Sequence, residues 1–189
     1  VRKALADGGV ALIEAGTGTG KSLGYRVPSV LHSLETGERV VVSTHTRNLQ
    51  DQLFRKEMGV LEAALSVDAN AARLLGRDNY LCTKRVISRA ASLAEETCAP
   101  ALAFALFVSC AEGGTLDSLG ALPGGLDSRA LAAPSRCPMN ACAFAGRCPL
   151  IRARKRAREA RILFVNHALL LTDYQQGGAV IGPYARVVF

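Results

Sequence analysis

A glycine-rich segment near the start of the chain constrains its fold most. It reads Glu-Ala-Gly-Thr-Gly-Thr-Gly-Lys-Ser over residues 14–22, between an apolar run at 10–13 and a helical pattern that begins near Lys21. A buried strand, a glycine-rich turn and a helix in this order make a phosphate-binding loop. We therefore predict a strand over Val10–Ala15, then this loop, then a helix.

The residue types of this segment suit a nucleoside triphosphate. Glycines let backbone N–H groups turn toward phosphate oxygens, and the start of the following helix adds positive charge. Lys21 would reach the β- and γ-phosphates and Ser22 would hold Mg²⁺, so these are the predicted catalytic residues. The alternative is a glycine-rich turn without a ligand. The predicted nucleotide-binding residues are Ala15, Gly16, Thr17, Gly18, Thr19, Gly20, Lys21 and Ser22.

The composition is that of a folded, basic chain. Of its 189 residues 49% are hydrophobic, which is enough for a core, and the formal net charge of +7 favours a polyanionic partner. No apolar run approaches the length of about eighteen residues that a membrane span needs, so we expect no membrane partner. The chain starts at Val1 and stops within an apolar pattern at Arg186–Phe189, which suggests a piece of a longer protein.

Strand and helix patterns alternate on both sides of a different middle region. Residues 1–75 and 151–189 carry this alternation, which predicts parallel strands crossed by helices. Residues 76–150 hold all six cysteines and several glycine-rich turns, and we interpret them as an inserted module. Besides the first strand, the predicted elements are the helix Lys21–Leu34 with a bend near Pro28, the strand Arg39–Thr44, the helix Asn48–Glu57 with Leu49, Leu53 and Phe54 on one face, the helix Ile151–Ala160, the strand Ile162–Val165, the short helix His167–Leu171 and the strand Arg186–Phe189.

The cysteines of the middle region admit four interpretations. Four residues separate Cys137 from Cys142 and five separate Cys142 from Cys148, while Cys82 lies far upstream. Disulfides fit a reducing interior poorly, and zinc sites usually have tighter spacings, often with histidine. An iron–sulfur cluster takes four thiolates, and we expect its larger size to suit wider loops; small buried side chains are the fourth possibility. The spacing favours a cluster over zinc, and burial is preferred for Cys98 and Cys110.

Several motifs together resemble those of the DinG/YoaA-type, XPD-like iron–sulfur DNA helicases of superfamily 2. Residues 14–22 are similar to motif I of that group and residues 43–53 to its motif Ia. Residues 76–82 are similar to the entry of its cluster domain, and the cysteine triplet and residues 165–171 follow in the same order. The likeness covers most of the chain.

The resemblance implies a RecA-like motor domain over 1–75 and 151–189, with a partial parallel sheet, interrupted by a mainly helical cluster domain over 76–150. It implies Cys82, Cys137, Cys142 and Cys148 as ligands of a [4Fe–4S] cluster. ATP and Mg²⁺ would be the other cofactors, and the activity would be 5′-3′ translocation on single-stranded DNA or on DNA with a single-stranded tail, in the bacterial cytoplasm at the nucleoid. An Asp-Glu-Ala-His box would follow Phe189, so we expect this segment alone to hydrolyse ATP hardly at all.

The expected DNA contacts fall in two places. Strand ends in parallel sheets carry ligand-binding residues, and the run of basic residues at 151–161 could follow a phosphate backbone or be a solvated helix face. The predicted DNA-binding residues are Thr44, Thr46, Arg47, Arg77, Arg152, Lys155 and Arg156. His45 and His167 are predicted to be structural, and Gln50 and Asp51 to be exposed.

Two other functions stay open. One is a single-strand translocase or nuclease-linked motor that moves without unwinding. The other belongs to a different class, a zinc-stabilised nucleotide-binding module that acts through protein contacts.

Overall fold

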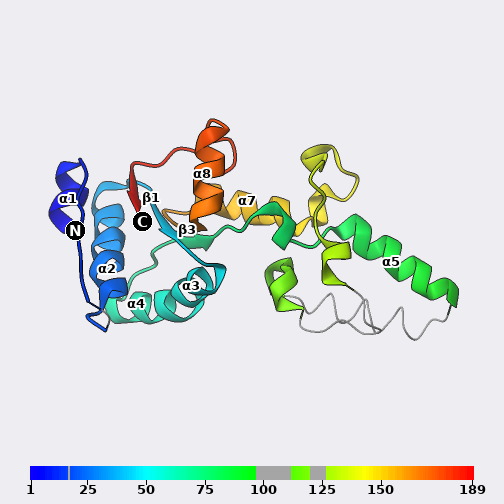
Figure 1. The fold of residues 1–189 in the computed structure, drawn as a ribbon, viewed down its shortest axis with the longest axis horizontal. Coiled ribbons are helices and arrows are strands. Elements are labelled where there is room, and N and C mark those ends of the chain that lie inside the picture. Colours follow the sequence, from blue (N-terminus) through cyan, green and yellow to red (C-terminus); the bar gives the residue numbers. More distant parts are fainter. Residues whose placement is uncertain (17, 97–111, 120–126) are drawn as a thin grey trace. The chain divides into compact units, whose positions relative to one another are not determined.

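A computed structural model describes residues 1–16, 18–96, 112–119 and 127–189 (Figure 1). Thr17, Cys98 and Cys110 lie outside the described residues. The chain divides into two compact units, Val1–Leu74 with Arg156–Phe189, and Leu75–Lys155. The assignment of 1–75 and 151–189 to a motor domain and of 76–150 to a cluster domain stays a prediction.

The first unit is built on a parallel sheet of four strands in the order β2-β3-β1-β4. Val40 of β1 pairs with Ile162 of β3 and with Arg186 of β4. Around the sheet lie helices α2, α3, α4 and α8 (Figure 1). The elements are α1 (Arg2–Asp7), α2 (Lys21–Thr36), β1 (Val40–Thr44), α3 (Arg47–Asp51), a π-helix η1 (Gln52–Glu57), α4 (Met58–Leu65), β2 (Ala71–Arg73), β3 (Ile162–Asn166), α8 (His167–Gln175) and β4 (Arg186–Val188).

The two central strands carry the core. Every residue of β1 is buried, as are the first four of β3, which is typical of parallel strands covered on both faces. Helix α2 contributes Val30 and helix α4 contributes Leu61 to the same apolar cluster. The predicted parallel α/β class is confirmed, and the predicted strands at 39–44 and 162–165 and the helix after the loop are found.

The predicted strand Val10–Ala15 is wrong for this structure. The described residues of this stretch have no strand pairing, and the side chains of Val10 and Leu12 are fully exposed. A run of apolar residues becomes a strand only where a neighbouring strand takes its N–H and C=O groups and an apolar layer covers its side chains. Neither lies against residues 10–13 here.

The predicted helix Asn48–Glu57 begins at Arg47 and changes type midway. The backbone N–H of Met58 donates to the carbonyl of Leu53, five residues back, which is the π-helical pattern. Leu53 is completely buried as predicted, but Leu49 is 40% exposed. Gln50 takes the place next to the sheet instead, for a reason that its hydrogen bonds explain below.

The described residues of the second unit form helix α5, most of helix α7 and a series of short turns. Helix α5 (Thr83–Glu96) packs Val86, Ala90 and Leu93 on a small core of Leu81, Leu119 and Leu131. Helix α7 (Pro149–Glu159) belongs to this unit up to Lys155. The 3₁₀ turns are η2 (Arg77–Asn79), η3 (Glu112–Gly114), η4 (Leu116–Ser118), η6 (Ser128–Leu131), η7 (Met139–Ala141) and η8 (Ala145–Arg147). Among the described helices, none is both long and apolar enough to cross a membrane.

Candidate functional site

The glycine-rich loop ends in the geometry of a helix start. Gly18 and Gly20 have backbone φ values of 77° and 76°, which residues with a Cβ adopt only with strain. Gly20 caps α2, and its carbonyl accepts the N–H groups of Leu23 and Gly24, both at 3.0 Å. Lys21 therefore occupies the first position of the helix, where backbone N–H groups have no intrahelical acceptor.

The loop is held closed by two side chains of its own. The Lys21 ammonium donates to the Ala15 carbonyl at 3.0 Å, and the Thr19 hydroxyl donates to the Gly16 carbonyl at 2.8 Å. Lys21 is exposed and Ser22 half-buried. Among the described members of the predicted nucleotide site, 15–16 and 18–22, the structure thus joins Ala15 to Lys21 and Gly16 to Thr19 at the start of α2.

An ion pair that the sequence did not predict lies one turn further along α2. The Arg26 side chain is only 1% exposed; its Nε donates to the Ser22 carbonyl at 2.8 Å and its Nη2 to the Glu57 carboxylate. Burial raises the pKa of the neighbouring Tyr25 hydroxyl; Arg26 lowers it, Glu57 raises it, and a hydrogen bond with Ser22 lowers it. The sequence signal was an arginine four residues after Ser22 in an otherwise apolar pattern.

The carboxyl end of β1 leads directly into a capped helix. The Thr44 hydroxyl is buried and donates to the Thr46 carbonyl at 3.1 Å, while the Thr46 hydroxyl accepts from the Leu49 N–H at 3.2 Å. Thr46 is thus the N-cap of α3. Thr46 and Arg47 are exposed at this edge of the sheet, and Thr44 lies beneath them.

Two histidines meet at the same edge. The Ser43 hydroxyl and His167 Nδ1 lie 2.6 Å apart, and the His167 ring centroid is 6.1 Å from that of His45 and 5.7 Å from that of Phe189. The structural role that we predicted for these histidines agrees with such packing.

Gln50 corrects a second prediction. It is completely buried, and its amide nitrogen donates to the Leu74 carbonyl at 2.9 Å and the Phe164 carbonyl at 2.8 Å. Leu74 directly follows β2 and Phe164 lies in the middle of β3, where its carbonyl also accepts the Leu74 N–H at 2.9 Å, so Gln50 supplies the Leu74 carbonyl with a donor and the Phe164 carbonyl with a second one. Asp51 is partly exposed and pairs with Arg55 and Arg73.

The four predicted ligand cysteines are free, half-buried thiols. Cys82 donates its N–H to the Leu131 carbonyl at 2.8 Å, just before α5, and Cys148 just before α7 accepts the Arg152 N–H at 3.1 Å. The Thr83 hydroxyl donates to the Arg147 carbonyl at 3.1 Å, which holds the flanks of Cys82 and Cys148 together. Among the described residues, no group of three or more His, Cys, Asp or Glu is gathered as a metal site.

The basic residues of α7 differ in their contacts. Arg154 donates to the Met139 sulfur at 3.9 Å and Arg158 to the Ala179 carbonyl at 3.0 Å. The three residues of α7 that were predicted to bind DNA are exposed, namely Arg152, Lys155 and Arg156. Arg77 is half-buried in η2.

No family model matches the chain, but known proteins do. The ATP-dependent DNA helicase YoaA of Escherichia coli is 30% identical over 180 residues, 92% of this chain and 27% of the helicase. YoaA of Haemophilus influenzae is 29% identical over 203 residues, 100% of this chain and 30% of the helicase. The 3′-5′ exonuclease DinG of Staphylococcus aureus is 38% identical over 71 residues, 38% of this chain and 8% of the exonuclease. The chain spans less than a third of these relatives.

Proposed function

The chain belongs to the DinG/YoaA type of DNA helicase proteins, and we propose that it forms part of a motor that uses ATP to move 5′ to 3′ along single-stranded DNA. The observation that carries this proposal is the loop at the start of α2, with Lys21 folded over it. Its two left-handed glycines and its position at a helix N-terminus fit a triphosphate.

Lys21, Ser22 and the first N–H groups of α2 have defined tasks in this proposal. The Lys21 ammonium exchanges the Ala15 carbonyl for β- and γ-phosphate oxygens and neutralises their charge. The Ser22 hydroxyl would hold Mg²⁺, whose charge would help to neutralise the triphosphate. The first N–H groups of α2 add donors that need no reorganisation during the reaction.

DNA would bind through surface residues of both units. Thr46 and Arg47 at the end of β1 and the exposed residues of α7 offer hydroxyl and guanidinium donors for phosphate oxygens. Such contacts displace counterions, so affinity should fall steeply with salt. The buried Thr44 would support Thr46 rather than touch the strand.

For the cysteines we propose a [4Fe–4S] cluster held by Cys82, Cys137, Cys142 and Cys148. Free thiols, the wide spacing and the bond between Thr83 and Arg147 support this set, and the cluster would cross-link a unit with a small core. Zinc on the same thiols is the competing form, in a nucleotide-binding module that acts through protein contacts. The two forms are distinguished by measuring the iron, sulfide and zinc content of unaltered protein and of Cys137→Ser, both purified without air. The proposal requires iron and sulfide in the unaltered protein and their loss in the variant.

The exonuclease name of the Staphylococcus aureus relative favours one alternative, a nuclease-linked motor or translocase that moves without unwinding. Strand displacement by the full-length protein distinguishes unwinding from movement alone. A motor that hydrolyses ATP on DNA and displaces no strand would support the alternative.

The loop is tested with Lys21→Ala in the full-length protein. We expect DNA-stimulated ATP hydrolysis to fall at least about 100-fold, because the charge that neutralises the phosphates is lost. Lys56→Ala is the matched control, since Lys56 is an exposed lysine of η1 outside the loop. Equal activity of the two variants would remove Lys21 from the site and refute the proposed role of the loop.

A further inference from the structure

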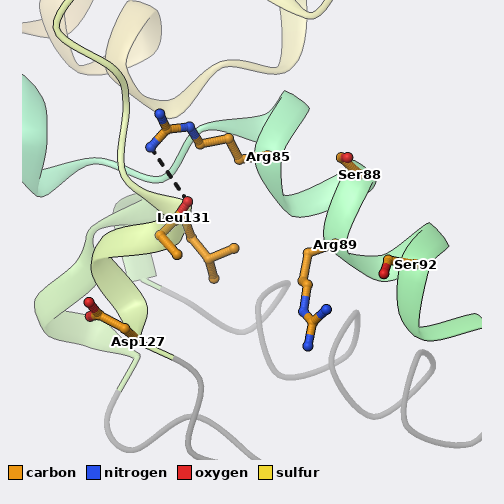
Figure 2. Close-up of a pocket in the computed structure, with 7 residues that line it drawn as sticks. Arg85, Ser88, Arg89, Ser92, Asp127 and Leu131 are labelled. Carbon is orange, nitrogen blue, oxygen red and sulfur yellow. Dashed lines mark hydrogen bonds between the residues drawn. The ribbon is translucent and has the colours of Figure 1, made fainter.

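A cavity of about 580 Å³ lies within the second unit, between α5 and the turn η6 (Figure 2). Its size is in the range of small-molecule sites, about 300–1,000 Å³. It contains neither the glycine-rich loop nor a cysteine. The residues that line it are Arg85, Ser88, Arg89, Ser92, Asp127, Ala130 and Leu131.

The sequence of α5 explains why this wall is polar. One face of the helix carries the apolar residues that pack on the core of the unit. The adjoining face presents two arginines and two serines at i, i+3, i+4 and i+7, a spacing that aligns them along the helix. These four are Arg85, Ser88, Arg89 and Ser92.

The two arginines of this wall have different tasks. Arg85 Nη1 donates to the Ala132 carbonyl at 2.9 Å and also reaches the Ala130 carbonyl at 3.5 Å, so it fastens α5 to the turn. Arg89 is half-buried, and its Nε has no hydrogen-bond partner within the described part of the chain. Its guanidinium points away from α5 into the space beside the turn (Figure 2). A buried donor of this kind needs an acceptor, and phosphate suits a guanidinium best.

The remaining residues of the cavity suit the sugar and base that a nucleotide carries beside its phosphate. Ala130 and Leu131 form an apolar wall. Asp127 accepts the Arg129 N–H through Oδ1 at 2.9 Å, and its carboxylate offers further acceptor capacity for a sugar hydroxyl or an amino group. Two guanidinium groups against one carboxylate leave the site positive, which favours an anionic ligand.

We propose that this cavity is a second nucleotide site, which binds one phosphate group and its nucleoside, either within a DNA strand or as a free nucleotide. Arg89 with the Ser88 and Ser92 hydroxyls would hold the phosphate, and Ala130 and Leu131 would pack on the base. The strand-bound form rests on the proposed function; the free form does not.

The first test measures affinity of the full-length protein for a short oligothymidylate at several salt concentrations. Arg89→Gln should weaken binding about tenfold near 0.1 M salt and lower the slope of log affinity against log salt by about one. Lys84→Gln is the matched control, with the same charge change on an exposed residue of the same helix outside the cavity. If the two variants weaken binding equally, the loss reflects the net charge of the protein and not a contact of Arg89, and the proposed site is refuted. Arg89→Lys retains the charge and controls for misfolding of the variants. Its affinity for the oligothymidylate should lie between those of the wild type and Arg89→Gln.

The second test separates the two sources of the phosphate. Modification of Arg89 by phenylglyoxal is followed by mass spectrometry with oligothymidylate, thymidine 5′-monophosphate or thymidine present. Protection by the monophosphate but not by thymidine supports a free-nucleotide site, and protection by the oligonucleotide alone supports a strand site. If neither oligothymidylate nor thymidine 5′-monophosphate protects Arg89 while the protein still binds DNA, the proposed site in the cavity is refuted and the proposed motor function is not. A wild-type protein that binds no DNA overturns the motor instead.

Discussion

The two members of the buried Arg26–Glu57 pair should contribute very differently to the free energy of unfolding when each is replaced. Arg26 is 1% exposed and Glu57 27% exposed at the side chain, so most of the desolvation falls on the arginine. Arg26 Nη1 is moreover buried without a partner in the described chain. The glutamate is also held by Gln52, whose amide nitrogen donates to it at 2.8 Å. Removing one member of the pair should therefore cost far more than removing the other.

Glu57→Gln leaves the Arg26 charge buried beside a neutral amide. Loss of one partner of a buried pair costs about 3–5 kcal/mol, and the partial exposure of Glu57 reduces this to about 2–3 kcal/mol. Arg26→Leu removes the buried charge and its unpartnered N–H group together, and it leaves a carboxylate that water reaches. We expect Arg26→Leu to change the free energy of unfolding by about 1 kcal/mol or less. The double variant should match Arg26→Leu within about 0.5 kcal/mol, because no buried charge remains to be paired.

Urea unfolding followed by circular dichroism measures these free energies. Hydrogen exchange of α2 locates the change in the first unit, since the chain has two units and need not unfold in one step. Glu35→Gln is the matched control, because Glu35 pairs with Arg2 at 3.5 Å on the surface and should matter by less than about 0.5 kcal/mol. A larger loss in Arg26→Leu than in Glu57→Gln would refute the reasoning.

Three further predictions concern buried polar groups. Because burial raises the pKa of Tyr25, the folded state favours the neutral hydroxyl, and the free energy of unfolding should fall as pH rises above about 10. The urea midpoint should therefore drop between about pH 8 and about pH 10.5, and the drop should be smaller in Tyr25→Phe. Gln50→Leu should cost about 1–3 kcal/mol, since the buried Leu74 carbonyl loses its donor while the Phe164 carbonyl keeps only the Leu74 N–H; an unchanged urea midpoint would contradict this. Asp173→Ala should cost about 1–3 kcal/mol and speed hydrogen exchange at Val180 and Ile181, whose N–H groups Asp173 accepts at 2.7 and 3.2 Å; unaltered exchange there would count against it.

The fold could be predicted where the signal is local. The β-branched run at 40–44 and the apolar run at 162–166 form strands because their own composition requires burial on both faces. The glycines before Lys21 fix the start of α2 for a similarly local reason. The run at 10–13 has the same composition, yet it forms no strand, because pairing depends on a neighbour that sequence alone does not supply.

The site could be predicted in part for the same reason. The loop residues follow from a motif, so the start of a helix at Lys21, directly after Gly20, could be predicted, while the role of these residues in binding stays a prediction. Gln50 could not be predicted, because its burial is set by carbonyls of Leu74, which follows β2, and of β3 that are distant in sequence. Arg89 stands out in the sequence as one of the basic residues that follow Cys82, but its place in the cavity could not be predicted, because the turn Ser128–Leu131 is distant in sequence.

The π-helix at Gln52–Glu57 gives the stretch from α3 to α4 an unusual tolerance. Its buried residues are Gln50 and Leu53 on one side and Met58 and Leu61 on the other, with a step of five in between instead of three or four. One extra residue corresponds to a rotation of about 100°. Removing a single residue between Leu53 and Met58 would shorten that step to four, which an ordinary α-helix keeps on one face, so the π turn absorbs one residue that the packing of the two ends does not require.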